Sequence, residues 1–383
     1  MAGHTGSLKK MSGWLKRPTE SDRDALLPVT KKARSMTSKE VRLREQFRLT
    51  PVDIQKGEMS LLESQAVGEP CADCYKSLML RFENFCEENG FKANTDAELD
   101  MALLEFYDHL FMEEEPLDQG TKTLAAVGHH RPRFHRSSRT GLLPRARRAL
   151  QGWQRIAPLP TRLPLPWIAV AGIAMVLAAD GHPKAAVAVM VGADAYLRPG
   201  EIRGILPEDV VAGRGEVGKA YSFTSLLLNP EHRGVQTKTH QFDDSVIFDS
   251  KGREWIGEAL MIASKSTLEG QPIFNYQAAK FNTLFRNAGA KIGLGQHDLV
   301  PYLLRHTGPS HEYLTKTRSL ADIKRRGRWR SDASVRRYEK SSRVMSQLGK
   351  LAAPQLAYMR KAEKNLFAVL CRGQTPLPPP PLH

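Results

Sequence analysis

The sequence predicts a mainly α-helical protein with a small antiparallel β-sheet in its second half. Apolar residues recur at helical spacing between about 70 and 112, and two apolar helical runs follow at 167–179 and 184–197. Between 221 and 250 the pattern changes to YSFTSLLL, GVQTKT and DSVIFDS, separated by turn residues. Helical patterns return after Gly252. Helices, a short sheet and helices again indicate an α+β domain dominated by helix.

Length and charge indicate about two domains and an anionic partner. A chain of 383 residues can form two hydrophobic cores. The formal net charge of +15 favours polyanions, with nucleic acid first and an anionic membrane second. The longest apolar run, 167–179, is too short to span a bilayer, and no basic amphipathic helix stands out. We therefore expect double-stranded DNA, and no membrane, as the partner.

The chain divides into five expected segments. Residues 1–45 read as a basic flexible tail, whose two basic clusters suit a nuclear address. A helical domain at 46–156, a proline-rich linker at 157–166 and a second domain at 167–350 follow. Residues 351–383 complete the chain with a helix and a proline-rich tail.

The helical domain should contain two amphipathic helices with an apolar stripe. The stripe residues are Cys74, Leu78, Phe82, Phe85 and Cys86, then Leu99, Leu103, Phe106, Tyr107 and Leu110. CADC at 71–74 has no second cysteine pair, so we expect no metal site there. Four cysteines are too few for a disulfide framework, which favours a reducing, intracellular compartment.

A long interval carries positive charge alone. Between Gln119 and Ala179 there are ten Lys or Arg and no Asp or Glu, which suggests contact with a phosphate backbone. The residues expected to bind DNA here are Arg131, Arg133, Arg136, Arg139, Arg145, Arg147 and Arg148.

The stretch RGRWRSDASVRRYEK at 326–340 places a tyrosine among arginines. Ser319 and Asp322 have the form of a capping box for the preceding helix. Ser331 can cap a further helix at about 332–345, on which Val335, Tyr338 and Met345 share a face. Tyr338 should therefore point inward. It is either an ordinary core tyrosine or a nucleophile.

Two upstream segments favour the nucleophile. AYLRPGEIRGI at 195–205 and PYLLRHTGPSH at 301–311, followed by Trp329 and, nine residues later, Tyr338, resemble the tyrosine recombinase (integrase) superfamily. The family has two arginine motifs, here called the first and second arginine boxes. The first is matched by Arg198 and Glu201, and the second by Arg305 and His306. The family's hairpin lysine is best matched by Lys238, with Lys219 and Lys251 as weaker candidates.

The resemblance implies a role for each matched residue. Arg198 and Arg305 would stabilise charge on a phosphodiester, as an oxyanion hole does. Tyr338 would attack the phosphorus, Lys238 would protonate the leaving 5′-oxygen, and Trp329 would donate its indole N–H. Glu201 and His306 would act behind these groups. A covalent intermediate conserves the bond energy, so no metal or other cofactor is expected.

The sequence departs from the family at Tyr302, where histidine is usual. A phenol is a poor proton acceptor near neutral pH. The leading interpretation is a site-specific DNA recombinase or integrase. One alternative is a catalytically weakened or inactive recombinase-derived DNA-binding protein, and another is an enzyme like type IB topoisomerases.

The resemblance also implies an assembly on DNA. The 46–156 helices would clamp DNA, and four protomers would form a homotetramer on two duplexes during synapsis. The C-terminal helix would dock on a neighbouring subunit. The protein would be intracellular and DNA-associated, and nuclear in a eukaryotic host. Arginines flanking Trp329 and Tyr338 should hold the adjacent DNA backbone: Arg328, Arg330, Arg336 and Arg337.

Overall fold

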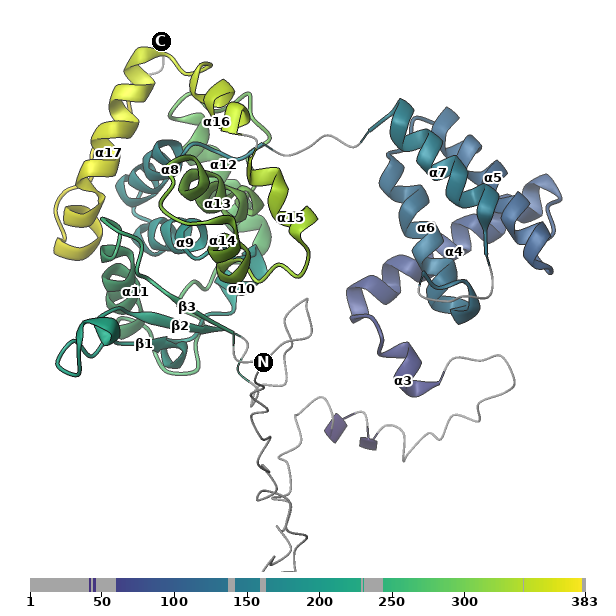
Figure 1. The fold of residues 1–383 in the computed structure, drawn as a ribbon, viewed down its shortest axis with the longest axis horizontal. Coiled ribbons are helices and arrows are strands. Elements are labelled where there is room, and N and C mark those ends of the chain that lie inside the picture. The colour runs from purple at the N-terminus through teal and green to yellow at the C-terminus, as the bar shows by residue number, and fades with distance from the viewer. Residues whose placement is uncertain are drawn as a thin grey trace, which may run out of the picture.

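The computed structural model describes residues 41–42, 44–45, 60–136, 142–158, 163–228, 230, 244–339 and 341–380. Most of the predicted tail at 1–45 lies outside these residues, as do Arg139, Lys238 and the expected strand GVQTKT. The side chain of Arg337 is also outside the description. The described chain is mostly helical and contains a small three-stranded antiparallel sheet (Figure 1), so this part of the fold prediction is confirmed.

The buried apolar residues form two large clusters that share no member. One lies within residues 60–158, here called the N-terminal body, and the other within 163–380, the C-terminal body. A third, small cluster surrounds Tyr338.

The N-terminal body consists of α3 (Leu61–Ser64), α4 (Glu69–Asn89), α5 (Asp96–Met112), α6 (Leu117–His130) and α7 (Pro144–Ile156). Local signals set the ends of its long helices. Gly90 adopts a left-handed conformation that stops α4, and Thr95 forms a capping box with Glu98 that starts α5. The predicted apolar stripe is buried, for example at Phe82 and Phe106.

The C-terminal body is built around α8 (Trp167–Ala179), which is buried along most of its length. It packs against α9 (Pro183–Asp194), α12 (Ala278–Ala290) and α17 (Ala353–Arg372). The helix is apolar on every side because every side faces protein. Where α17 crosses it, α8 has Gly172, at which a Cβ atom would lie 3.0 Å from Met359 Cγ.

The sheet comprises β1 (Val210–Val211), β2 (Ser225–Leu228) and β3 (Asp244–Ile247), in the order β1-β2-β3. Leu226 on the central strand pairs with Val210 on one side and Val246 on the other, and all three are buried. One face of the sheet therefore joins the core, beside α11 (Trp255–Lys265). Strands β2 and β3 fall within two of the predicted segments.

The predicted continuous helix at 332–345 is wrong. The chain forms α15 (Asp332–Arg336), a 3₁₀ turn at Arg337–Glu339 and α16 (Ser341–Leu348), so one helical phase does not run through the segment. Val335 and Tyr338 are buried as predicted, but Met345 is 57% exposed and Val344 faces inward instead.

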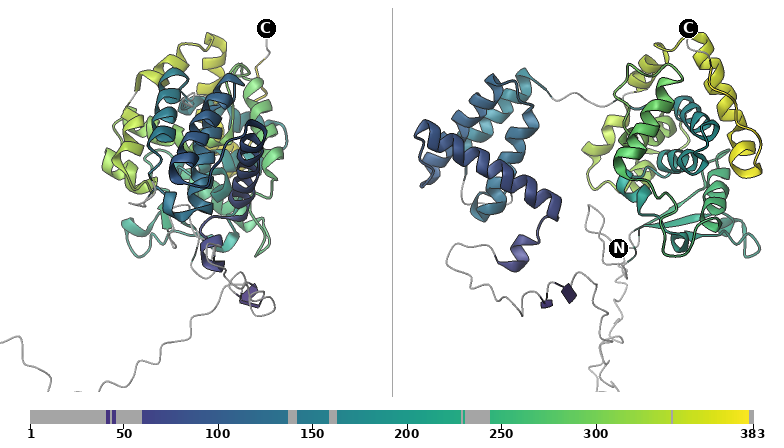
Figure 2. Two further views of the ribbon diagram at one scale, coloured as in Figure 1. Left: turned by 90° about the vertical axis from the view of Figure 1, so that its right-hand side faces the viewer. Right: turned by 180° about the vertical axis from the view of Figure 1, so that it is seen from behind.

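The C-terminal helix lies on its own chain. Helix α17 runs along the outside of the C-terminal body (Figure 2) and buries Met359 and Leu366 against the α8 core. The tail beyond it also returns, because Tyr358 donates a hydrogen bond to the Leu377 carbonyl. The buried face of α17 is therefore covered within the chain. No described helix is both long and apolar enough to cross a bilayer.

Candidate active site

The first arginine box forms a helix N-terminus. After α9 the chain turns at Tyr196, whose φ of 54° is left-handed, and Arg198 then precedes α10 (Pro199–Arg203). Pro199 occupies the first helical position, where its fixed φ favours helix initiation. Glu201 accepts from the Arg198 backbone N–H at 2.7 Å and from Arg198 Nη1 at 2.6 Å. The Arg-x-x-Glu spacing thus brings both side chains to one point.

The second arginine, Arg305, lies at the start of α13 (Leu304–Leu314) and is 1% exposed. It donates hydrogen bonds to the backbone carbonyls of Tyr196 and Gly327. Burial, together with the nearby guanidinium groups of Arg198 and Arg328, lowers its pKa to about 10. Arg305 therefore ties the first arginine box to the segment that carries Trp329.

Trp329 joins the arginines to Tyr338. The Arg305 guanidinium lies over the indole, 4.8 Å from its centroid, and the Tyr338 ring centroid is 5.1 Å from that of Trp329. Gly327 is required beneath the indole, because a Cβ there would lie 1.8 Å from a Trp329 ring carbon. The sequence GRW is therefore a packing unit that holds the indole between Arg305 and Tyr338.

The Tyr338 hydroxyl is inside the protein and contacts a histidine. Tyr338 is 3% exposed, and its hydroxyl oxygen is 3.0 Å from His306 Nδ1. His306 is also buried, and the Tyr302 ring packs edge-on against it with centroids 5.2 Å apart. A tyrosine and a histidine within hydrogen-bond reach have the arrangement of a nucleophile with its proton acceptor.

From the sequence, His306 was given a supporting role, and the structure places its Nδ1 3.0 Å from the Tyr338 hydroxyl oxygen. His306 follows Arg305 directly and lies four residues after Tyr302, so one helical turn brings both rings to the same side. That spacing could have indicated the pair. The contact between His306 and Tyr338 depends on the tertiary fold, so the spacing alone could not have indicated it.

Three arginines meet at Glu201, and we call this group the Glu201 cluster. Arg328 Nη2 donates to Glu201 Oε2 at 2.8 Å, and Arg305 Nη1 lies 3.9 Å from the same oxygen. With Arg198 on the other oxygen, Glu201 holds all three. Burial opposes its ionisation, but Arg328, the Arg198 backbone N–H and the other arginines hold the pKa of Glu201 below its ordinary value.

Arg328 differs from expectation in its exposure. It was predicted to lie on the DNA-facing surface, yet it is buried against Glu201. Arg330 and Arg336 are exposed, as a backbone contact requires. Lys219 and Lys251, the weaker candidates for the hairpin lysine, are both exposed.

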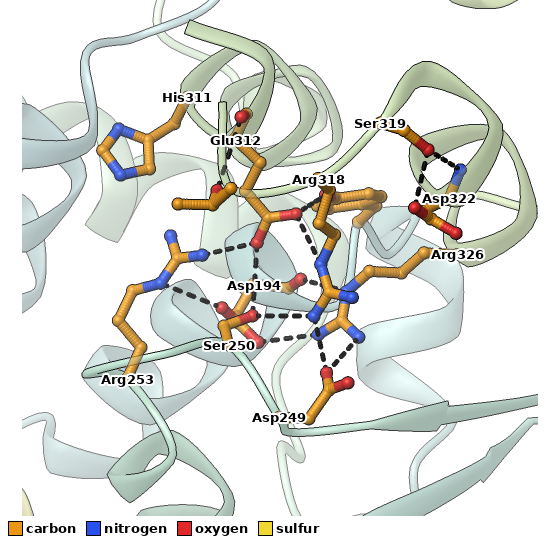
Figure 3. Close-up of polar contacts among 12 residues, drawn as sticks. Asp194, Asp249, Ser250, Arg253, His311, Glu312, Arg318, Ser319, Asp322 and Arg326 are labelled. Carbon is orange, nitrogen blue, oxygen red and sulfur yellow. Dashed lines mark hydrogen bonds and ion pairs between the residues drawn. The ribbon is translucent and has the colours of Figure 1, made fainter. Parts of the chain in front are cut away.

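A second buried ionic group lies behind this site (Figure 3), and nothing in the sequence pointed to it. We call it the Glu312 cluster. Its acids and arginines are Asp194, Asp249, Glu312, Arg253, Arg318 and Arg326.

Glu312 is the centre of this cluster. Its carboxylate accepts from Arg253 and from Arg318 Nε at 2.9 Å, and the Tyr196 hydroxyl also donates to it. Tyr196 in turn supplies the carbonyl that binds Arg305, and its ring stacks on Trp329. Tyr196 therefore connects the two clusters.

The arginines of the N-terminal body are mostly on its surface. Arg136, Arg145 and Arg148 are exposed, Arg131 donates to the Ala93 carbonyl and Arg133 pairs with Asp96. Arg147 is partly covered and donates to the Phe134 carbonyl at 3.4 Å. Exposed and only lightly paired, these cations can reach an external anion.

Comparison with protein-family models gives no match for this chain, and comparison with curated proteins gives none either. Among the described residues, no group of three or more His, Cys, Asp or Glu side chains could hold a metal ion.

Proposed function

We propose that the protein cuts and rejoins DNA strands through a 3′-phosphotyrosyl intermediate, as a site-specific recombinase or integrase of the tyrosine recombinase type. The contact between Tyr338 and His306 carries the proposal, because it pairs a phenol with a base beside buried guanidinium groups.

The proposed first step balances as a transesterification. The Tyr338 oxygen attacks the scissile phosphorus while its proton passes to His306 Nδ1, and the bond from phosphorus to the 5′-oxygen breaks. The 5′-oxygen leaves as a hydroxyl after taking a proton, for which Lys238 remains the proposed donor. Attack by a 5′-hydroxyl of a partner strand reverses the step and rejoins DNA.

His306 offers an answer to the difficulty that Tyr302 raises. Tyr302 occupies the family's histidine position, and its ring lies edge-on to His306, whose Nδ1 is 3.0 Å from the Tyr338 hydroxyl oxygen. An imidazole accepts a proton near neutral pH, whereas a phenol does not. In this proposal His306 is the proton acceptor and Tyr302 positions its ring.

The arginines would stabilise the transition state. A five-coordinate phosphorane carries more negative charge than the bound phosphodiester, and guanidinium groups stay charged at any working pH. Arg198 and Arg305 already meet at Glu201, Arg305 also lies over Trp329, and each well-placed donor of this kind is worth about 3–4 kcal/mol.

The rest of the proposal concerns DNA binding. The N-terminal body would clamp double-stranded DNA through exposed arginines such as Arg145 and Arg148. Four protomers would assemble on two duplexes during synapsis, in an intracellular, DNA-associated setting.

One observation favours a second candidate, a recombinase-derived protein that binds DNA without cutting it. Tyr338 is 3% exposed, so a scissile phosphate reaches it only after the surrounding segment moves. This candidate predicts salt-sensitive DNA binding with no covalent adduct.

The deciding experiment traps the covalent complex. Full-length protein is incubated with a library of nicked duplexes from which the cleaved end diffuses away, and protein–DNA adducts are isolated under denaturing conditions. Wild type should form an adduct, Tyr338→Phe should form none, and Tyr313→Phe, a tyrosine packed on the same small cluster, should resemble wild type.

Three other outcomes are informative. An adduct in Tyr338→Phe at the wild-type level would show that the nucleophile is wrong. Salt-sensitive binding without an adduct would favour the inactive candidate. Relaxation of a supercoiled plasmid that carries no specific target site would favour a topoisomerase-like activity.

A further inference from the structure

Arg328 has a backbone conformation that its side chain disfavours. Its φ is 57°, in the left-handed region that glycine adopts freely and other residues adopt at a cost. Such strain persists only where the surrounding structure enforces it, and it is concentrated at functional sites. A glycine here would satisfy the turn, so a large cationic side chain calls for another explanation.

The guanidinium of Arg328 is buried and incompletely used. Its side chain is 4% exposed, and Nη2 is the atom that donates to Glu201. Nε lies 3.9 Å from Asp244 Oδ2, beyond hydrogen-bond distance, and neither Nε nor Nη1 has a hydrogen-bond partner among the described residues. Buried donors without a partner are rare, because leaving one unpaired is costly.

The charges around Arg328 do not balance. Three guanidinium groups, those of Arg198, Arg305 and Arg328, face Glu201 and Asp244, the two carboxylates that the described part of the chain pairs with them. One positive charge is left over. The lowered pKa of Arg305, caused by burial and then by neighbouring arginines, is what an excess of buried cations produces.

We propose that Arg328 is a third guanidinium of the phosphate site, and that its unpaired Nη1 donates to a non-bridging oxygen of the scissile phosphodiester. This inference rests on the proposed function. A phosphodiester brings one negative charge, which balances the Glu201 cluster, and a guanidinium N–H group donates a charge-assisted hydrogen bond to a phosphate oxygen. Arg328 then contacts the reacting phosphate rather than the flanking backbone.

Arg328→Gly separates binding from folding. Glycine suits the left-handed backbone, and Glu201 keeps Arg198 and Arg305 as partners, so Arg328→Gly should remain folded and lose less stability than a variant that leaves a buried charge unpaired. On a nicked duplex with a normal scissile phosphate, the rate of adduct formation should fall about 10²–10³-fold. Arg330→Gly, at an exposed neighbouring arginine, should change that rate by about twofold or less.

A neutral scissile linkage tests contact with the oxygen itself. In a methylphosphonate one non-bridging oxygen is replaced by methyl, and the two stereoisomers can be assayed separately. For one stereoisomer, the ratio of the wild-type rate of adduct formation to the Arg328→Gly rate should be smaller than on phosphate by about tenfold or more. The reason is that the phosphate oxygen proposed to bind Arg328 is already absent from that substrate. The inference would be overturned if Arg328→Gly lost the same factor in rate on phosphate and on both stereoisomers, or lost none on any of them.

Thermal unfolding in inorganic phosphate tests anion binding by Arg328 separately from strand cleavage. At equal ionic strength, phosphate should raise the unfolding temperature of wild type above that in chloride, and should do so far less in Arg328→Gly. If no DNA forms an adduct but this Arg328-dependent shift appears, the anion site stands and strand cleavage fails. If both the adduct and the shift are absent, the inference fails as well.

Discussion

The C-terminal body buries two groups of arginines that differ in charge balance. In the Glu312 cluster, three arginines meet three acids, and hydrogen bonds from Tyr196 and Ser250 complete the central carboxylate. In the Glu201 cluster, three arginines face two acids among the described residues. Each cluster has buried polar atoms without a hydrogen-bond partner there, such as Arg253 Nη1 and Arg328 Nη1, so the clusters differ in net charge. Both are covered from solvent, so burial alone does not separate them.

The difference in charge balance suggests different uses for the two clusters: the Glu312 cluster suits a structural role and the Glu201 cluster suits anion binding. A balanced cluster gains nothing from a further ion, and its arginines serve to hold α9, α13 and α14 (Leu320–Arg326) together. An unbalanced cluster is less stable than it would be with an anion bound, which is what a phosphate site requires. The clusters should therefore respond in opposite ways to mutation and to phosphate.

The largest expected effect is on stability, from Glu312→Gln. Arg253 and Arg318 would remain buried without their common carboxylate, which typically costs about 3–5 kcal/mol. Urea denaturation measures the free energy of unfolding. Asp180→Asn, which removes a more exposed ion pair with Lys291, is the control and should cost about 1 kcal/mol or less. A small loss in Glu312→Gln would show that the cluster is not structural.

Arg198→Ala should show the reverse pattern. Its side chain is 20% exposed, so stability should change by about 1 kcal/mol or less, while adduct formation should slow by about 10²–10³-fold. Arg203→Ala, on the same short helix, is the matched control and should leave the rate near that of wild type. A stability loss as large as that in Glu312→Gln would contradict the comparison.

His311 gives the Glu312 cluster a pH signature. Burial, and then the adjacent Arg253, lowers its pKa to about 4 from 6.5. As pH falls below about 6.5 the unfolded chain takes up a proton there that the folded chain takes up only near pH 4. Unfolding is therefore favoured, by about 3 kcal/mol at the acid end.

The test of this effect is urea denaturation at pH 7, 5.5 and 4.5. His311→Gln should lose less stability over this range than wild type does, while His130→Gln, at an exposed histidine, should follow wild type. Identical pH profiles for wild type and His311→Gln would refute the assignment.

Glu201→Gln should sharpen the difference between the clusters. Without Glu201 the site gains a second unbalanced positive charge, and a unit charge at about 4 Å is worth about 1–4 kcal/mol depending on screening. Inorganic phosphate should therefore raise the unfolding temperature of Glu201→Gln more than that of wild type. Phosphate should bring no comparable gain in Glu312→Gln, and an equal gain in both variants would remove the distinction.

Local patterns accounted for much of the fold. Helical periodicity placed Phe82 and Phe106 in a core, and the spacing of Arg198 and Glu201 brought two polar side chains to one helix end. The inward direction of Tyr338 also followed from spacing. Each of these depends on residues within a few positions of one another, for which helix geometry is sufficient.

The remaining features depend on contacts between distant segments. Glu312 is 59 residues from Arg253 and 116 residues from Tyr196 along the chain, so no local pattern links them. Arg328 was assigned to the surface because it stands among arginines, whereas its burial depends on Glu201, far upstream. The α-helix that begins at Asp332 ends at Arg336 and is followed by a 3₁₀ turn, although the sequence pattern predicted that the helix continues. No local sequence signal marks this break.

Under the proposed function, the burial of Tyr338 would make the free protein latent. Because Tyr338 is 3% exposed, its hydroxyl would react with a diffusing phosphodiester or with a tyrosine-modifying reagent only after its segment opens. The observed rate of cleavage would then be the intrinsic rate multiplied by the fraction of molecules that are open. Only a duplex that binds the open form more tightly raises that fraction, so target choice would be exerted before any bond is broken.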